Sequence, residues 1–401
     1  MREVVVTGLG ATTPLGGDMP STWQALLAGE SGVSVIETEW AAPLPSRIAG
    51  RLKVDPLEVM SRVEARRLDR VEQIALIAGR EAWADAGSPE VDPIRLAVVI
   101  GTGVGGALTM LGQNDIIERS GHGRVSPHTV PMIMPNGPSA YVSMDLGAKG
   151  GARTPVSACA AGAEAIAFAA DLIRLGRADV VVTGGAEACL HQLTLAAFAQ
   201  MRALSTRNDT PTTASRPFDV SRDGFVMGEG AALLVLERAD FAAARGAKVY
   251  GRVAGSGITS SALHITASDP DGQARAIGLA LADAGLAALD VDHVHAHATS
   301  TPQGDVAEAE AIITALGSHP IVTATKSMTG HLIGASGALG AISALLSVRD
   351  GVIPATINLT EQDPEIKVEV AQGTARATTV RAAVANSFGF GGHNVSLAFT
   401  P

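Results

Sequence analysis

Short apolar segments alternate with alanine-rich segments along the whole chain, and this alternation restricts the fold more than any other feature of the sequence. Residues 3–10, 96–103, 179–186 and 230–237 are apolar runs with the length of buried strands. Residues 72–87 have the apolar spacing of a helix that ends at a glycine. Such an alternation predicts an α/β protein whose helices pack on the faces of a sheet.

The second part of the chain repeats this rhythm, with similar elements but without similar residues. The repetition predicts two related halves, residues 1–245 and residues 246–401, which form one compact unit. Most of the expected strands end in Gly, Ser or Thr, so the loops that follow them can approach a ligand closely. In the second half we expect strands at residues 249–258, 292–299, 320–327 and 382–399, and helices at 273–286, 305–317 and 338–351.

The composition fits a compact globular protein and argues against several classes of function. The 401 residues are 46% hydrophobic and only 3% aromatic and include 45 glycines, which is typical of a core of small residues. A net charge of −10 gives no general sign of nucleic-acid binding, and no uninterrupted apolar run reaches membrane-spanning length. The presence of only two cysteines, with no signal-peptide pattern in MREVVVTGLG, predicts a cytoplasmic protein without disulfides.

One cysteine stands at the start of an alanine-rich helix, in TPVSACAAGAEAIA (residues 154–167). Residues 154–158 resemble the end of a buried strand, and the helix that follows closes at Gly176. Cys159 is therefore expected where free N–H groups and the helix dipole favour a thiolate. Position alone leaves two interpretations open, a nucleophile or a small core residue. Cys189 has no comparable setting, and we expect it in the core.

Two glycine-rich turns, GTGVGG (residues 101–106) and GFGGHN (residues 389–394), invite a nucleotide-binding interpretation. The first lacks the full G-x-G-x-x-G spacing, and the second lacks the lysine of a P-loop. We expect instead that these glycines allow backbone N–H groups to approach a reacting carbonyl.

Three histidines, His293, His295 and His297, alternate in DHVHAHATSTP (residues 292–302) and project to one face if the segment is a strand. A metal site is one interpretation. Three ligands on one strand would lie in a row, however, whereas metal sites usually recruit ligands from several elements. We therefore expect no metal, with His297 facing a site, His295 lying deeper and His293 structural or exposed.

The segment TATKSMTGHLIGASG (residues 323–337) supplies two further chemical groups. A strand is expected to end at Lys326, with His331 in a glycine-flanked loop before a helix of small residues. Cys159, His297, Lys326 and His331 would then all lie near the carboxyl ends of strands, where open α/β sheets hold ligands. A cysteine at a helix start together with two histidines favours acyl-transfer chemistry.

Longer motifs follow one another from end to end: VVVTGLGATTPLG, SACAAGAEA, ALSTRND, ASRPFDVSRDGFVMGEGA, HATSTPQGD, TKSMTGHLIGASG and NSFGFGGHN. The chain thereby resembles the elongating β-ketoacyl-[acyl-carrier-protein] synthases, and is most similar to the KAS II members of bacterial fatty-acid synthase. The resemblance implies a thiolase fold, in which two similar halves form an α-β-α-β-α five-layer sandwich, and a homodimer.

The resemblance also implies a mechanism. Cys159 would receive an acyl chain from acyl carrier protein as a thioester. Malonyl carrier protein would then lose CO2, and His297 and His331 would stabilise the resulting enolate, which attacks the acyl group. The backbone N–H groups of Cys159 and Phe390 would form the oxyanion hole. No cofactor is implied, because the substrates are carried on the phosphopantetheine of the carrier protein.

Further site residues are assigned by the same motifs. Lys326 would order the histidines and nearby waters, supported by Asp305 and Glu308. Docking of the acidic carrier protein to this acidic chain requires a local basic patch. The residues implied for the acyl pocket and its gate are Val104, Phe198, Phe225 and Phe390. For docking, the helix-spaced arginines of MSRVEARRLDR are candidates, unless they form an ordinary solvated helix face: Arg62, Arg66, Arg67 and Arg70. The resemblance adds Arg124 and Arg202 to the docking candidates.

The sequence departs from the family pattern near the catalytic motifs. Ala298 stands where the family usually has Gly, and His295 stands where it commonly has Asn. Gly340 replaces an acidic residue that usually lies nine positions after the second catalytic histidine. Some relatives bind a monovalent cation near these Asn and acidic positions, so the departures bear directly on that site. The loss of a carboxylate near Lys326 should also alter the arrangement of protons and water.

Three rival functions have distinct sequence requirements. A degradative thiolase needs a second catalytic cysteine in its C-terminal glycine motif, which GFGGHN lacks. A non-catalytic chain-length partner has usually lost the nucleophile, whereas Cys159 is present. A ketosynthase of a type II polyketide or other secondary pathway, paired as a heterodimer with an inactive chain-length-factor homologue, would have the same catalytic residues. It remains the alternative.

Overall fold

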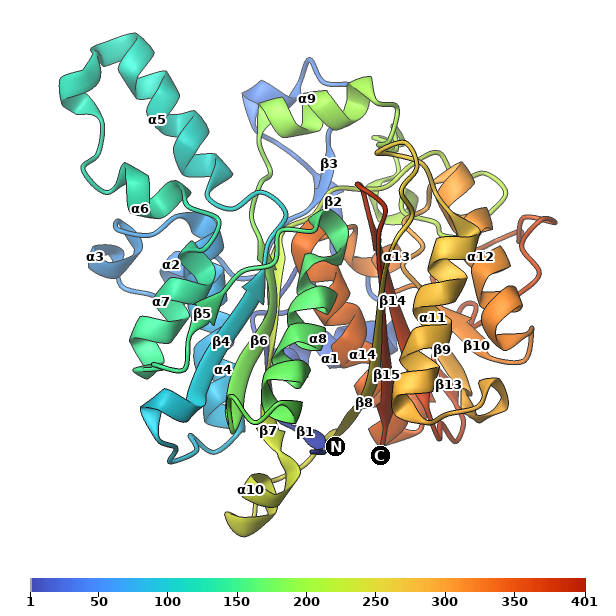
Figure 1. Cartoon of the computed structure of the whole chain (residues 1–401). Helices are drawn as coiled ribbons and strands as arrows, with labels where there is room; N and C mark the ends of the chain where they lie inside the picture. The colour runs from blue at the N-terminus through green and yellow to red at the C-terminus, as the bar shows by residue number, and fades with distance from the viewer. Residues whose placement is uncertain (1) are drawn as a thin grey trace.

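The computed structural model describes residues 2–401; residue 1, which belongs to the expected N-terminal half, lies outside them. The protein is built around an 11-stranded sheet with the order β12-β10-β9-β14-β15-β8-β1-β7-β6-β4-β5 (Figure 1). The first half of the chain supplies β1 (Val4–Thr12), β4 (Leu96–Gly101), β5 (Ala152–Arg153), β6 (Val180–Glu187) and β7 (Gly230–Arg238). The second half supplies β8 (Gly251–Ser260), β9 (His293–His295), β10 (Ile321–Thr323), β12 (Glu369–Val370), β14 (Ala383–Gly389) and β15 (His393–Thr400).

Two sets of strands in this sheet have the same order and the same directions. The set β5-β4-β6-β7-β1 matches the set β10-β9-β14-β15-β8. In each set the first three strands run parallel, and each of the last two runs antiparallel to its neighbour. The sets meet where β1 pairs with β8 through Val5–Arg252 and Val6–Gly251. The architectural repeat expected from the sequence is therefore present in the topology.

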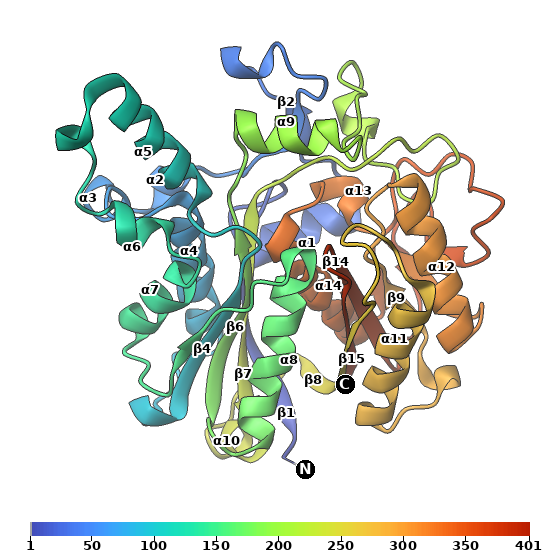
Figure 2. The same cartoon turned by 45° about the horizontal axis from the view of Figure 1, so that its top comes forward.

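Helices form three layers around and between these two sets of strands (Figure 2). Helices α8 (Ala161–Arg174) and α14 (Ser336–Asp350) lie in the middle, where their side chains share one core with both sets. Helices α4 (Arg70–Asp85) and α7 (Gly137–Leu146) cover the outer face of the first set, and α11 (Pro270–Ala284) and α12 (Pro302–Leu316) cover that of the second. The expected five-layer thiolase fold is confirmed.

The two central helices pack closely because glycines lie at their contact. A Cβ atom at Gly162 of α8 would lie 2.6 Å from the carbonyl oxygen of Gly334, and one at Gly337 of α14 would lie 2.9 Å from the backbone nitrogen of Ala163. Real Cβ atoms essentially never approach other atoms within 3.0 Å. The N-terminal ends of α8 and α14 can therefore meet only if these positions carry no side chain.

Shorter elements cover the ends of the sheet. A projecting arm contains α5 and α6, and α9, which follows β6 in the chain, lies at the top of the view (Figure 1). The remaining helices are α1 (Met19–Ala28), α2 (Pro56–Val59), α3 (Arg62–Ala65), α5 (Ala107–Ser120), α6 (Thr129–Ile133), α9 (Gln192–Gln200), α10 (Ala239–Ala244) and α13 (Lys326–Thr329). Two small antiparallel pairs are formed by β2 (Val33–Val35) with β3 (Ile48–Gly50) and by β11 (Val352–Ile353) with β13 (Arg376–Ala377).

Four expected strands end earlier than the sequence predicted, among them β4 at Gly101 and β9 at His295. Residues 154–158 do not end a buried strand, because β5 stops at Arg153, is exposed, and is followed by irregular chain containing Pro155. Proline has no N–H to donate to a strand ladder. Strand β10 stops at Thr323, since the N–H of Ala324 donates to the Thr356 hydroxyl, and Lys326 begins α13. The last two differences move catalytic candidates from strand ends into short turns.

The expected division between residues 245 and 246 falls in the connection from α10 to β8 and stays a prediction. The helices within residues 2–401 include none that is long and apolar enough to cross a membrane.

We predict that Gly162→Ala destabilises the protein, because the added methyl group must push apart the ends of α8 and α14. Overpacking of this kind costs about 1–3 kcal/mol of unfolding free energy, which urea denaturation can measure. The matched control is Gly278→Ala in α11, where a Cβ meets no atom within 4 Å. This control should be neutral or stabilising by up to about 1 kcal/mol. Equal effects of the two substitutions would contradict the proposed close contact.

Candidate active site

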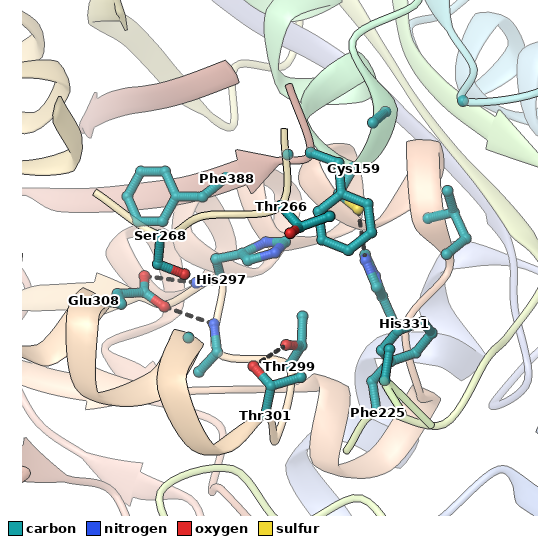
Figure 3. A pocket seen from close by; sticks show the side chains of 18 of the residues that line it. Cys159, Phe225, Thr266, Ser268, His297, Thr299, Thr301, Glu308, His331 and Phe388 are labelled. Atoms are coloured by element: carbon teal, nitrogen blue, oxygen red, sulfur yellow. Dashed lines mark hydrogen bonds between the residues drawn. The ribbon is translucent and has the colours of Figure 1, made fainter. Parts of the chain in front are cut away.

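A pocket lies where the two halves meet, and its wall combines residues that are far apart in the sequence (Figure 3). Cys159 comes from the start of α8, His297 from the loop after β9, and His331 from the turn before α14. Its other lining residues include Val104, Ala158, Phe198, Phe225, Thr266, Ser268, Gln273, Thr299, Thr301, Glu308, Ile333, Phe388, Phe390 and Asn394. The pocket therefore contains three of the four residues that the sequence analysis placed at one catalytic centre.

Cys159 lies in the 3₁₀ turn Ala158–Ala160 that leads into α8. Ala158 has φ 51°, a left-handed conformation that is uncommon for a residue with a side chain. The Ser387 hydroxyl donates to the carbonyl of Cys159 at 2.9 Å and fixes the turn from the neighbouring strand. The backbone N–H groups of Cys159 and Phe390 both act on the thiol sulfur, where they lower its pKa. The turn thus directs the sulfur and two backbone donors toward the same point.

Burial decides the ionisation of this cysteine. It raises the pKa of the Cys159 thiol to about 11, and Glu187 acts in the same direction. The positive charge of Lys326 and the two N–H groups act in the opposite direction without cancelling the effect of burial. The expectation that the helix start favours a resting thiolate is therefore wrong, and the resting group is a thiol.

The imidazole of His331 contacts this thiol directly. Its Nε2 lies 3.0 Å from the Cys159 sulfur, and its Nδ1 lies 2.9 Å from the Ser336 hydroxyl oxygen. The Ser336 oxygen also accepts the N–H of Leu332, which fixes its position. Since a hydroxyl can either donate or accept, Ser336 accommodates both neutral tautomers of His331. His331 is thus held in place for proton exchange or for hydrogen-bond donation.

His297 faces His331 across the pocket, with ring centroids 5.5 Å apart and the rings nearly perpendicular at 85°. Phe388 packs beside His297, and Phe225 packs beside His331. Burial and the charge of Lys326 hold the pKa of both imidazoles well below the usual 6.5. Both histidines are therefore neutral at physiological pH.

Lys326 lies behind the pocket wall and is buried. Its ammonium donates to the carbonyl of His297, and burial lowers its pKa to about 8. Glu308 accepts the N–H groups of His297 and Ala298 at 2.7 and 2.6 Å, and burial raises its pKa to about 7. Lys326 and Glu308 therefore hold the His297 backbone from its carbonyl and its amide.

Asp305 has a different set of partners from those expected. Its carboxylate accepts the N–H groups of Phe218 and Ser300 and lies 3.7 Å from the Arg222 guanidinium. Among the described residues its side chain has no hydrogen bond to Lys326. Asp305 therefore organises the loop after His297 and acts on Lys326 only through its charge.

A family sequence model described as the β-ketoacyl synthase N-terminal domain matches residues 1–242, and the model of the C-terminal domain matches residues 250–360. The chain belongs to the β-ketoacyl synthase family. Relatives of this family named 3-oxoacyl-[acyl-carrier-protein] synthase 2 are 48% identical in Mycobacterium bovis and 45% identical in Synechocystis. Each alignment covers 99% of this chain, with 96% and 98% of the relatives respectively.

Solved ketosynthase structures have the same fold. The ishigamide ketosynthase/chain length factor superposes with a TM-score of 0.94 at 33% identity, over 100% of this chain and 99% of that chain. A β-ketoacyl synthase from Burkholderia phymatum superposes with a TM-score of 0.92 at 36% identity and the same coverage. A type II polyketide acyl carrier protein in complex with its hexaketide-bound ketosynthase gives 0.91 at 30% identity, also over 100% and 99%.

The four residues assigned to the acyl pocket of this β-ketoacyl synthase all line the cavity. The rings of Phe198 and Phe225 meet edge to face with centroids 5.3 Å apart. Val104 and Phe390 are more exposed, at 44% and 38%, and lie in the glycine-rich turns GTGVGG and GFGGHN. The buried ring of Phe225 and the partly buried ring of Phe198 are thus fixed by packing, whereas the exposed pair lies on loops.

The arginines assigned to docking do not form one uniform group. Arg70 binds Glu229 through two hydrogen bonds of 2.8 and 2.9 Å and also pairs with Asp55, so its charge is already neutralised. The other five are exposed: Arg62, Arg66 and Arg67 on and beside α3, Arg124 in the turn after α5, and Arg202 after α9.

The three alternating histidines lie in two different places. His297 lines the pocket, as the sequence suggested, and His293 and His295 are buried behind it. His293 is structural: it is buried, and its Nδ1 bonds the carbonyl of Ile321 at 2.8 Å. Within residues 2–401, the ligand atoms of these three histidines do not form a group close enough to share one ion. A different trio has ligand atoms within 4.8 Å of one another, namely Cys159, His297 and His331, and these are the residues proposed for catalysis.

Sequence reasoning missed several residues of the site. Ser336 stands in a recognised motif but gives no signal of its own, because only the structure shows its bond to His331. Thr266 and Ser268 lie in the loop after β8, where a strand's carboxyl end could have drawn attention to them. Glu187 is buried and accepts N–H groups from Gly103 and Gly334, so it joins two loops of the site.

We predict that native Cys159 reacts slowly with iodoacetamide at pH 7.5, about 100-fold more slowly than a thiol of pKa about 9, because only the thiolate reacts. The rate should rise about tenfold per pH unit up to pH 10. Peptide mass spectrometry can measure it at each pH. Cys189, which is 1% exposed, is the internal control and should stay unlabelled. A rate that is already constant above pH 7 would show a resting thiolate instead.

Proposed function

We propose that the protein is a 3-oxoacyl-[acyl-carrier-protein] synthase that elongates fatty acids by decarboxylative condensation. The observation that supports it most directly is the convergence of the Cys159 thiol, two neutral imidazoles and two backbone N–H donors in one pocket. Thiol nucleophiles, proton acceptors and oxyanion donors are the groups that acyl transfer requires.

In the first step, the sulfur of Cys159 attacks the thioester carbonyl of acyl carrier protein. The S–H proton passes to Nε2 of His331, which lies 3.0 Å away, because a thiol with a pKa of about 11 must lose its proton during attack. The N–H groups of Cys159 and Phe390 stabilise the tetrahedral oxyanion. The carrier's sulfur then leaves and takes the proton as a thiol, and the acyl group remains on Cys159.

In the second step, malonyl carrier protein enters and its C–CO2 bond breaks. His297 and His331 donate hydrogen bonds to the thioester oxygen, where negative charge develops as the enolate forms. The enolate carbon attacks the acyl carbonyl on Cys159, the C–S bond breaks, and the cysteine sulfur takes up one proton from solvent. Lys326 and Glu308 keep the His297 backbone in position. The product is a 3-oxoacyl carrier protein.

Sequence similarity favours the fatty-acid pathway over the polyketide alternative. The relatives named 3-oxoacyl-[acyl-carrier-protein] synthase 2 share 43–48% of residues with this chain over nearly its whole length. The ketosynthases whose titles name ishigamide or a type II polyketide pathway share 33% and 30%. The catalytic groups would be the same in both pathways, so this preference rests on similarity.

We further propose that the enzyme is a cytoplasmic homodimer that binds acyl carrier protein and uses no cofactor or metal. The two cysteines are free, which suits a reducing compartment. Strand β5 ends the sheet and is exposed, so a second copy can pair with it. The protruding α5 also exposes Met110 and Ile117, as an interface helix would.

The mechanism separates two half-reactions that can be measured independently. Cys159→Ala should abolish the acyl-enzyme, detected by intact mass, whereas the control Cys189→Ala should retain it. His297→Ala and His331→Ala should lower CO2 release from malonyl carrier protein by about 100-fold or more, since the enolate loses a donor. Acyl transfer should fall less in His297→Ala, whereas His331→Ala also removes the proton acceptor of the first step. Both half-reactions should survive EDTA. Acylation of Cys189, or unchanged CO2 release in both histidine variants, would refute the proposal.

Carrier-protein docking can be tested at the exposed arginines beside α3. Reversing Arg66 and Arg67 together to Glu should raise the KM for the carrier-bound substrate about three- to tenfold and weaken its salt dependence, because rim charges steer association. The kcat should change little. The control is Arg177→Glu, at the end of α8 that lies away from Cys159. If the control raises the KM as much as the double reversal, docking does not use this patch.

A further inference from the structure

His295 is fully enclosed between β9, α13 and α14, behind the catalytic pocket. Its side chain is 2% exposed, and its Nε2 lies 2.8 Å from the Thr325 hydroxyl. Its Nδ1 is buried without a hydrogen-bond partner among the described residues. A buried imidazole with one hydrogen bond and one unpaired nitrogen lowers the stability of the folded state. A role is therefore needed that would explain a histidine at this position.

Gly340 on α14 provides the space that this ring occupies. A Cβ atom at position 340 would lie 2.8 Å from both Cε1 and Nδ1 of His295. The contact is therefore too short for any residue with a side chain at 340 while the ring keeps its place. Residues 295 and 340 form a matched pair, in which a large side chain on the strand faces a bare backbone on the helix.

The ring connects the two segments that carry His297 and Lys326. His295 ends β9 two residues before His297. Thr325, its hydrogen-bond partner, immediately precedes Lys326 at the start of α13. The Lys326 ammonium in turn donates to the carbonyl of His297. His295, Thr325, Lys326 and His297 thus close a ring of contacts around one catalytic histidine.

Positions 295 and 340 correspond to the Asn and acidic residues near which some relatives bind a monovalent cation. Hard cations prefer oxygen ligands such as carboxylates and amide carbonyls. Here position 340 offers no side chain and position 295 offers an imidazole nitrogen, and the ring fills the space beside Gly340. The residues present therefore do not fit such a cation at this place.

We propose that His295 is a positioning residue that sets the distance between His297 and Lys326 through Thr325, in the space left by Gly340 and without a cation. The proposal rests on the function proposed above, because it assigns His297 to the condensation. The unpaired nitrogen also fits: if Nε2 carries the hydrogen and donates to Thr325, Nδ1 has only a lone pair. An unpaired lone pair is tolerated in protein interiors more often than an unpaired N–H.

Gly340→Ala and His295→Ala, alone and combined, test the pairing. Gly340→Ala should lower the kcat of malonyl decarboxylation about ten- to 100-fold, because the displaced ring shifts the reacting groups. Transfer of the acyl group to Cys159 should stay within about threefold of wild type, a difference that general destabilisation would not produce. The double variant should be no worse than His295→Ala, since no ring remains to be displaced.

Two controls make the result specific. Gly278→Ala is a second helix glycine to alanine change and should not alter either half-reaction. His295→Gln places an amide nitrogen near the position of Nε2 and should retain more decarboxylation than His295→Ala, which also covers the case in which His295→Ala does not fold. Replacing K⁺ and Na⁺ by tetramethylammonium at constant ionic strength should change the wild-type rate by less than about twofold.

The proposal is overturned if the effects of the two alanine substitutions multiply, if Gly340→Ala leaves decarboxylation unchanged, or if the rate falls without K⁺ and returns with it. Failure of the proposed function has a different signature. In that case the wild-type protein itself would form no acyl-Cys159 and no 3-oxoacyl product, whatever the residues at positions 295 and 340.

Discussion

The contact between the N-terminal ends of α8 and α14 is the constraint on which the active site depends. Gly162 and Gly337 allow the two helix ends to approach within backbone distance. One helix is preceded by Cys159 and the other by His331, so this approach brings sulfur and Nε2 to 3.0 Å. The reacting groups are held together by packing of the protein's most buried layer.

In the resting site the thiol and the two imidazoles that would react are uncharged. Burial keeps the Cys159 thiol protonated and both histidines neutral, and the ammonium of Lys326 is turned toward a carbonyl behind the wall. Charge therefore develops only when substrate arrives, at the places where backbone N–H groups and imidazoles await it. A helix start lowers a thiol pKa most effectively when water also reaches it, and here burial dominates.

Local sequence patterns predicted the long elements and the chemical groups, and failed where a distant residue decides the outcome. The apolar strands and alanine-rich helices were evident because their periodicity is local. The end of β10 depends on Thr356, the partner of Arg70 is Glu229, and the partner of His331 is Ser336 across a turn. The fit of His295 against Gly340 spans 45 positions of sequence and leaves no periodic trace. Such pairings become visible only after the chain has folded.

The matching strand orders of the two halves have a consequence for how the catalytic work is divided. Helix α8 lies between β5 and β6 in the chain, and α14 lies between β10 and β14. In the matching sets of strands, β5 corresponds to β10 and β6 corresponds to β14. The nucleophile therefore enters at one copy of a crossover unit and its imidazole partner at the corresponding place of the other. Each half preserves the scaffold but only part of the chemistry. The two matching halves therefore contribute different catalytic groups, and neither half contains the whole active site.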